Sequence, residues 1–157
     1  MELKFKVHTK VQKPVQEVFA AVYEPAKLSG YFTTGGASGP LEEGKTVIWE
    51  FADYPGKVPV TVKKVIPNEL IAFEWPADNP DAVPNEPYSS AGYNTRVEMR
   101  FTALEDGSTL VEISEEGWKE TEKGLKASYG NCFGWTQMSC SLKAFAEYGI
   151  NLRKGAF

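Results

Sequence analysis

The feature that most constrains the fold is a long helical pattern near the end of the chain, at residues 121–148. Within it Trp135, Met138, Leu142 and Phe145 recur at spacings of three, four and three, which is the period of a helix with one buried stripe. At about 1.5 Å per residue, this helix is on the order of 40 Å long, the width of a small domain. A stripe of that length needs a broad apolar surface, and we expect the preceding chain to supply it as a curved sheet.

The preceding residues alternate between apolar and polar side chains, as strands with one buried face do. The alternation begins at residues 3–11. Further alternating runs lie at residues 46–51, 58–63, 70–75, 93–101 and 109–114. Turn signals such as Pro67-Asn68 and Asp106-Gly107 join consecutive runs, so we expect an antiparallel meander.

Two short segments separate the first run from the others. Pro14 opens a short helix whose apolar residues repeat to Val22, and Pro25 ends it because a residue before proline is pushed out of the helical region. The glycine-rich stretch at residues 31–44 is typical of turns and a short edge strand. The sequence therefore predicts an α+β chain with a sheet of about six to seven strands and short helices after the first strand.

Residues 76–92 break the alternation. They include four prolines and few side chains that a core would bury. Structureless loops of this length are uncommon in compact domains and are usually functional or disordered. We interpret the segment either as a plain surface excursion or as a lid over the mouth of a pocket.

Length and composition predict one domain spanning residues 1–157. A chain of 157 residues can bury a substantial core without disulfides or a structural metal. The aromatic fraction of 13% exceeds what a minimal core needs, which permits a ring-lined pocket. The net charge of −4, without a block of like charges, argues against a nucleic-acid partner.

The sequence also predicts a cytoplasmic protein, which we expect to be a monomer. The opening MELKFKVHTK lacks the apolar core of a signal peptide, and no run approaches the length of a membrane span. Cys132 and Cys140 lie eight residues apart on the expected helix. Their Cα atoms would be roughly 12 Å apart, beyond disulfide reach, and unpaired thiols fit a reducing compartment.

Four motifs, in this order and spacing, carry a resemblance to a known family. They are VQKPVQEVFAAVYEPAKLSGYF at residues 11–32, GPLEEGKTVIWEF at residues 39–51, SEEGW at residues 114–118, and LKAFAEYG at residues 142–149, which follows Gly134-Trp135. Together they resemble the bacterial proteins similar to the activator of the heat-shock-protein-90 ATPase. The resemblance implies the helix-grip fold of the superfamily that includes START lipid-transfer domains, polyketide cyclases and birch-pollen-type allergens. It also implies a cavity between the long helix and the concave face of the sheet.

We find no set of residues with the chemistry of a catalytic or metal site, and we predict no cofactor. A zinc site needs clustered Cys, His or carboxylate ligands, whereas His8, the one histidine, falls on the charged side of the first strand. A Ser-His-Asp triad would need the same outward histidine. Glu50, Glu74 and Glu98 all fall on the polar side of their strands. Binding is therefore favoured over catalysis.

The expected helix has small residues in its first half, where a cavity could lie. Ala127, Ser128, Asn131 and Cys132 share the sector of Trp135, and small side chains over a concave sheet leave space. The predicted ligand-binding walls are Trp49, Phe51, Phe73, Trp75, Tyr93, Met99, Phe101, Trp118, Ser128, Asn131, Cys132 and Trp135. The alternative is that these rings pack to crystal-like density and fill the space themselves.

Gly130 and Gly134 are unusual in a helix interior, where each costs roughly 1 kcal/mol relative to alanine. They mark either a kink near the mouth of the pocket or a helix that begins only after Gly130.

The sequence favours binding of a hydrophobic or aromatic small molecule, or a lipid, without assigned catalysis. One alternative is a protein-interaction module that contacts a chaperone, as the resemblance implies. Another is a cyclase- or hydrolase-like enzyme that uses the same cavity, with Tyr93 or polar groups from residues 76–92.

Overall fold

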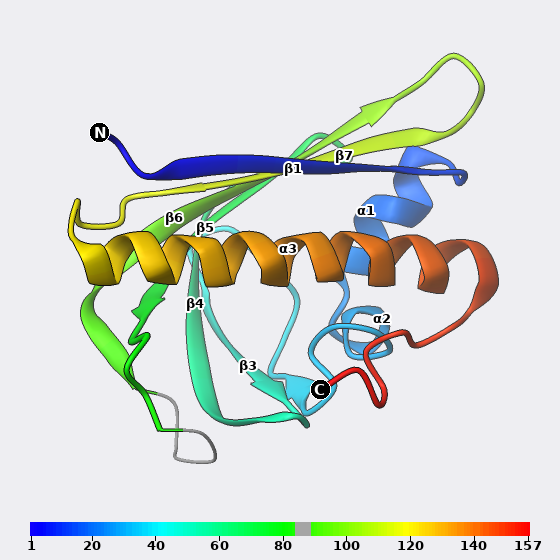
Figure 1. The fold of residues 1–157 in the computed structure, drawn as a ribbon. Coiled ribbons are helices and arrows are strands. Elements are labelled where there is room, and N and C mark those ends of the chain that lie inside the picture. Colours follow the sequence, from blue (N-terminus) through cyan, green and yellow to red (C-terminus); the bar gives the residue numbers. More distant parts are fainter. Residues whose placement is uncertain (84–88) are drawn as a thin grey trace.

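The structure, a computed structural model, describes residues 1–83 and 89–157. One curved antiparallel sheet wraps around one long helix (Figure 1). The strands are β1 (Lys4–Val11), β2 (Gly36–Ala37), β3 (Thr46–Phe51), β4 (Tyr54–Ile66), β5 (Leu70–Asp78), β6 (Ser90–Ala103) and β7 (Thr109–Glu116), and the helices are α1 (Val15–Tyr23), α2 (Pro25–Leu28) and α3 (Glu122–Tyr148). The predicted α+β helix-grip fold is confirmed.

The order of strands across the sheet is β1-β7-β6-β5-β4-β3-β2, with every neighbouring pair antiparallel. Strands β2 to β7 form the predicted meander, and β1 returns to pair with β7 from Lys4 opposite Glu116 to Val11 opposite Thr109. Side chains alternate between the two faces, as the sequence pattern predicts. His8 is exposed on the outer face.

Helix α3 crosses the concave side of the sheet as one continuous element (Figure 1). The Thr121 hydroxyl caps its start by accepting from the Gly124 N–H at 3.1 Å, and Gly149 ends it in the left-handed region, at φ 69°. The helix runs through Gly130 and Gly134, so the alternative start after Gly130 is wrong. Caps at both ends and a buried face along its length stabilise it despite the two glycines.

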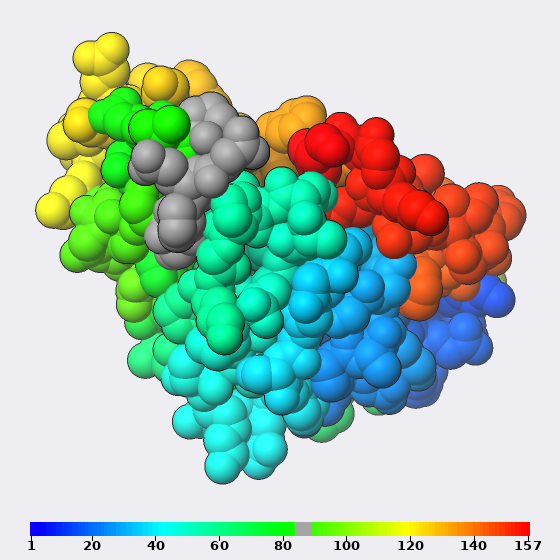
Figure 2. All heavy atoms as spheres, turned by 90° about the horizontal axis from the view of Figure 1, so that it is seen from below, coloured from blue at the N-terminus to red at the C-terminus, as the bar shows by residue number. Residues whose placement is uncertain are grey.

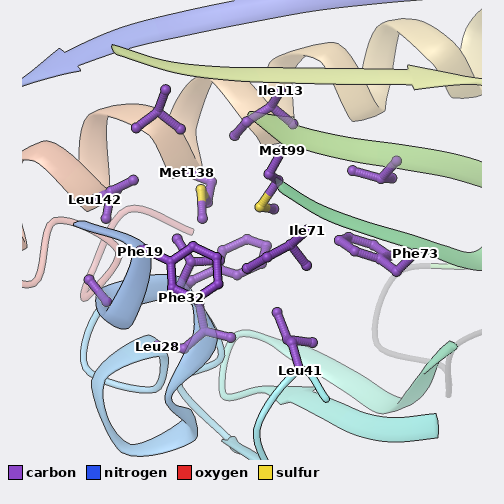
Figure 3. Packing of buried hydrophobic residues seen from close by; sticks show 14 of the residues in the cluster. Phe19, Leu28, Phe32, Leu41, Ile71, Phe73, Met99, Ile113, Met138 and Leu142 are labelled. Carbon is purple, nitrogen blue, oxygen red and sulfur yellow. The ribbon is translucent and has the colours of Figure 1, made fainter. Parts of the chain in front are cut away.

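The second half of α3 packs into the hydrophobic core (Figure 3). Met138 and Leu142 of the helix belong to one buried cluster with Met99 and Ile113 of the sheet and Phe19 of α1. All five are buried, and Leu142 has no exposed surface. Burying a side chain of this size contributes about 1.5–3 kcal/mol relative to leaving it exposed, so this half supplies much of the stability.

Strands β5 and β6 extend further than the sequence pattern predicts. The interruption predicted at residues 76–92 is shorter, because β5 continues to Asp78 and β6 begins at Ser90. The register shifts between Pro76 and Asp78, and such a bulge lets a strand accommodate a residue without an N–H donor. Residues 84–88 lie outside the described residues, so the choice between surface excursion and lid stays a prediction.

The predicted turn at Asp106-Gly107 does join β6 to β7 as a hairpin, but the connection is longer than these two residues. Strand β6 ends at Ala103 and β7 begins at Thr109, which leaves residues 104–108 as the connection. The Asp106 carboxylate accepts from the Ser108 backbone N–H at 3.1 Å, a local side-chain-to-backbone bond of the kind that favours turns. The turn at Pro67-Asn68 is confirmed, with Asn68 left-handed at φ 63°.

Candidate functional site: an aromatic pocket beneath the first half of α3

A pocket of about 290 Å³ lies between the middle of α3 and the ends of β3, β4 and β5. Arg153 and Phe157 of the C-terminal tail, residues 150–157, also line it. In Figure 2 this tail (red) meets the middle of α3 (orange) and the β3–β4 hairpin (blue-green) on one face of the molecule. We call it the α3 pocket. Its aromatic lining residues are Phe32, Phe51, Tyr54, Trp75, Phe133, Trp135 and Phe157.

Four of these rings form a continuous wall. The Trp75 and Trp135 rings are 5.2 Å apart, centroid to centroid. Phe32 lies 5.6 Å from Trp135 and 5.2 Å from Phe51. These separations are within the range in which aromatic rings attract one another beyond simple area burial. The wall therefore has a fixed shape even without a ligand.

Glu115 fixes the two indoles from behind. Its side chain is 1% exposed, and each of its carboxylate oxygens accepts from one indole N–H. Trp75 donates to Oε1 at 2.8 Å, and Trp135 donates to Oε2 at 2.7 Å. Thr95 donates its hydroxyl to Oε1 at 2.6 Å, and Asn131 donates its amide to both oxygens, at 3.0 and 3.2 Å.

Among the residues that the structure describes, the four hydrogen-bond partners of the buried Glu115 carboxylate are all uncharged. Burial raises the pKa of the Glu115 carboxyl, and the bonds from Thr95, Trp75, Trp135 and Asn131 offset part of that shift. Since Trp75, Asn131 and Trp135 also line the α3 pocket, one buried carboxylate positions three of its wall residues. Glu115 itself does not line this pocket, so it acts on a ligand through those residues.

Sequence reasoning missed Glu115. It assigned Thr109, Val111 and Ile113 to the inward face of their strand and treated residues 115–118 as the end of the sheet. Strand β7 continues to Glu116, and the same alternation then turns Glu115 inward. Carrying the period of two one step further would have placed a carboxylate beneath the helix.

A second acidic group lies at the pocket's β5 side. Asp78 lines the α3 pocket and is partly buried, and burial raises the pKa of its carboxyl. The pKa of the Tyr54 hydroxyl is also raised, first by burial and second by the negative charge of Asp78.

The tail closes the other side of the pocket with Arg153. Its guanidinium makes two contacts with Asp53: Nη2 donates to Oδ1 at 2.8 Å, and Nε lies 2.8 Å from Oδ2. Both side chains are largely buried, with 14% and 15% exposed. The guanidinium also lies over the rings of Phe51, at 4.8 Å, and Phe32, at 5.7 Å, within the distance of a cation–π interaction.

Gly130 and Gly134 line the pocket from the helix side. A Cβ atom added at either position would meet nothing within 4 Å. Larger side chains at these positions would therefore enter space that the glycines leave open. The two glycines that sequence analysis placed near the pocket mouth do border it.

The structure brings four of the twelve predicted wall residues to the α3 pocket: Phe51, Trp75, Asn131 and Trp135. Four others lie in the main core, namely Trp49, Phe73, Met99 and Phe101. Neighbouring side chains pack around these four residues, which is the arrangement that the solid-core alternative describes for this part of the sheet.

The remaining predicted wall residues lie elsewhere. Trp118 belongs to a smaller buried cluster, and Tyr93 packs beside it while accepting from the Lys119 N–H at 3.3 Å. Ser128 is buried and donates to the Leu125 carbonyl at 2.7 Å. Cys132 is half-buried and does not line the pocket. A ligand-binding role for these residues stays a prediction.

Among the residues that the structure describes, no three His, Cys, Asp or Glu side chains gather as metal ligands would. No helix in those same residues combines the length and apolar character needed to cross a bilayer.

Comparison with known proteins places this architecture in a family. Residues 12–147 match the family described as "Activator of Hsp90 ATPase homolog 1-like protein". The chain belongs to this family. The resemblance seen in the sequence motifs is thereby confirmed over most of the chain. No curated protein matches the chain.

Solved structures agree on the fold. The Aha1 dimer from Colwellia psychrerythraea is 22% identical, with a TM-score of 0.70 over 93% of this chain and 97% of that one. SSP2350 from Staphylococcus saprophyticus is 25% identical, with a TM-score of 0.71 over 95% and 96%. DynU16, from the dynemicin biosynthetic locus, is 20% identical, with a TM-score of 0.76 over 95% of this chain. This chain spans about half of DynU16, 49% of its length.

Proposed function

We propose that this member of the Hsp90-ATPase-activator-like family binds a small, ring-containing apolar molecule in the α3 pocket. The observation that carries the proposal is the pocket itself, which is walled by fixed aromatic rings and left open by two helix glycines. Concave, mostly apolar sites with a few placed polar groups are what small-molecule ligands occupy.

The dimensions favour a compact ligand over a long lipid chain. The pocket measures about 290 Å³, and typical ligand sites run from about 300 to 1,000 Å³. A molecule with one or two rings would fill it. Contact with the partly exposed Trp75 would orient such a ligand, since neither its indole nor that of Trp135 behind it can rotate without breaking its bond to Glu115.

Preorganisation of the wall supports the proposal energetically. A binding site whose side chains are already held in place loses little conformational freedom when the ligand arrives, so more of the contact energy remains as affinity. Here four neutral donors converge on Glu115, and three of them belong to wall residues. The alternative role of these bonds is stability alone.

The test is a titration with a panel of one- and two-ring compounds, followed by tryptophan fluorescence and by amide chemical shifts. Saturable changes should appear in the wild type and disappear in Gly134→Phe, whose added ring would occupy the pocket. Thr136→Phe is the matched control, since Thr136 is exposed on the same helix and outside the pocket lining, and it should bind as the wild type does. Equal binding by both variants would contradict the proposal.

A further inference from the structure

We propose that the α3 pocket prefers an organic cation, such as a quaternary ammonium carried on an aromatic ring, over a neutral or anionic ligand of the same shape. This inference rests on the proposed function and narrows its ligand class. It stands on three independent features of the pocket: its charge balance, the orientation of its indoles, and a cation that the chain itself already places against its rings.

The charge balance of the lining is negative. Of the described residues that line the α3 pocket, Asp53, Asp78 and Arg153 carry formal charges. Asp53 and Arg153 neutralise each other through their double contact, which leaves the negative charge of Asp78. Glu115 adds a second carboxylate directly behind the wall, bonded to uncharged donors. A ligand cation would offset these charges, whereas an anion would add to them.

The indoles of Trp75 and Trp135 have their N–H edges turned toward an anion. Each N–H points away from the pocket toward Glu115, so the positive edge of the ring is already occupied by an anion. The face of an aromatic ring carries the negative part of its quadrupole, and the partly exposed Trp75 is the indole that could offer its face to a ligand cation. Tryptophan is the strongest cation–π partner among the aromatic side chains.

Arg153 shows that this pocket can hold a cation against rings. Its guanidinium lies 4.8, 4.9 and 5.7 Å from the ring centroids of Phe51, Phe157 and Phe32, with Asp53 as its counter-ion. The lining contains a second set of the same components, rings and a carboxylate, in Trp75, Trp135 and Asp78 at the end of β5 and on α3. No cationic side chain of the described residues fills that side of the lining. The ligand cation is therefore placed at the β5 side, beside Asp78.

The experiment compares three ligands of one shape class on the full chain. They are benzyltrimethylammonium, its uncharged carbon isostere neopentylbenzene, and the anion phenylacetate, each titrated by amide chemical shifts at neutral pH. We expect the cation to bind about tenfold more tightly than the isostere, which is the size of a partly desolvated cation–π and ion-pair preference. Phenylacetate should bind more weakly than both.

Asp78→Asn removes the proposed counter-ion while keeping the shape of the side chain. It should bring the affinity for benzyltrimethylammonium down toward that for neopentylbenzene and leave the isostere's own affinity unchanged. Glu17→Gln, an exposed acid on α1 outside the pocket lining, is the control and should change neither. The wild-type comparison of the three ligands needs no variant, so it decides the question even if Asp78→Asn folds poorly.

The outcomes separate the two proposals. Saturable binding of the isostere with equal or higher affinity than the cation would overturn the cation preference and leave the pocket's binding function standing. A preference that survives unchanged in Asp78→Asn would overturn the role of that carboxylate. If none of the three ligands produced saturable shifts at residues of the α3 pocket, both the preference and the proposed function would be contradicted.

Discussion

At the scale of single residues, Glu115 is the most consequential side chain outside the apolar core. A carboxylate taken out of water without a cation is destabilising unless several donors replace its hydration. Trp75, Thr95, Asn131 and Trp135 supply those donors from strands β5 and β6 and from helix α3. Glu115 therefore links β5, β6 and α3 through hydrogen bonds to a single carboxylate.

We predict that Glu115→Gln lowers the free energy of unfolding by about 1–3 kcal/mol, the range for leaving a buried donor without a partner. The amide has one acceptor oxygen, so its NH₂ group must face at least one of the donors now bonded to the carboxylate. Urea denaturation at neutral pH would measure the change. Glu116→Gln, whose exposed ion pair with Arg96 should contribute less than about 1 kcal/mol, is the adjacent control; an equal loss in both variants would refute the prediction.

Glu115 also makes a pH-dependent contribution with a defined sign. Because burial raises its pKa above the ordinary 4.5, the unfolded chain releases this proton at lower pH than the folded protein does. Between the two pKa values the folded state holds more protons, so its stability falls as pH rises. Below the ordinary pKa of 4.5, Glu115 is protonated in both the folded and the unfolded state, so the two states bind the same number of protons at this group.

The measurement is the unfolding free energy of the wild type minus that of Glu115→Gln, at a series of pH values from 4 upward. We predict that this difference declines as pH rises through the window above 4.5. Asp78 is present in both proteins, so its own raised pKa cancels from the difference. A difference that stays constant, or that grows with pH, would show that the hydrogen bonds outweigh burial.

At the scale of elements, helix α3 divides into two halves with different tasks. Its second half fills the core with Met138 and Leu142, whereas Gly130, Asn131 and Gly134 of its first half border the pocket. The sequence predicted this division from the sizes of the side chains on one face. A helix that served stability alone would gain from replacing the glycines, which makes them the clearest mark of the pocket.

Accordingly, we predict that Gly134→Ala stabilises the protein by up to about 1 kcal/mol through helix propensity, because its Cβ meets nothing within 4 Å. Gly124→Ala on the same helix should destabilise it, since a Cβ there would collide with the Lys119 carbonyl oxygen. Thermal and urea unfolding of the two variants would test the pair. Destabilisation by both would mean that space around Gly134 is filled.

In the other half of the helix, Leu142→Ala should lower the free energy of unfolding by about 2–5 kcal/mol, as large-to-small changes at fully buried sites do. Leu142 has no exposed surface. Cys140→Ala, at an exposed position two residues away, should change it by less than about 0.5 kcal/mol. Similar, small effects from both substitutions would contradict the assignment of the buried face.

At the scale of the whole molecule, the sequence predicted the fold better than the site. Alternation and helical period are repeated many times along the chain, so the architecture survives an error at any one residue. The pocket depends on single positions at the ends of elements, where such patterns stop. Asp78 was placed in a loop because Pro76 looks like a strand end, although a bulge carries β5 past it.

The residues of the tail show a different reason for a missed prediction. Arg153 and Phe157 lie in a segment without periodic apolar residues, and their place in the pocket depends on how the chain turns back after Gly149. Phe32 likewise reaches the pocket from a loop after α2. Pairing of Arg153 with Asp53, 100 residues earlier, is a long-range contact that composition and spacing do not encode.

The central claim is that the α3 pocket is a ligand site, and the most direct measurement follows the indole N–H signals of Trp75 and Trp135 together with the amides of Gly130 and Gly134 during titration with benzyltrimethylammonium. We predict that these four signals shift together along one saturable curve, and that the curve is lost in Gly134→Phe. Shifts that are confined to other surfaces, or that grow linearly without saturation in both proteins, would contradict the claim.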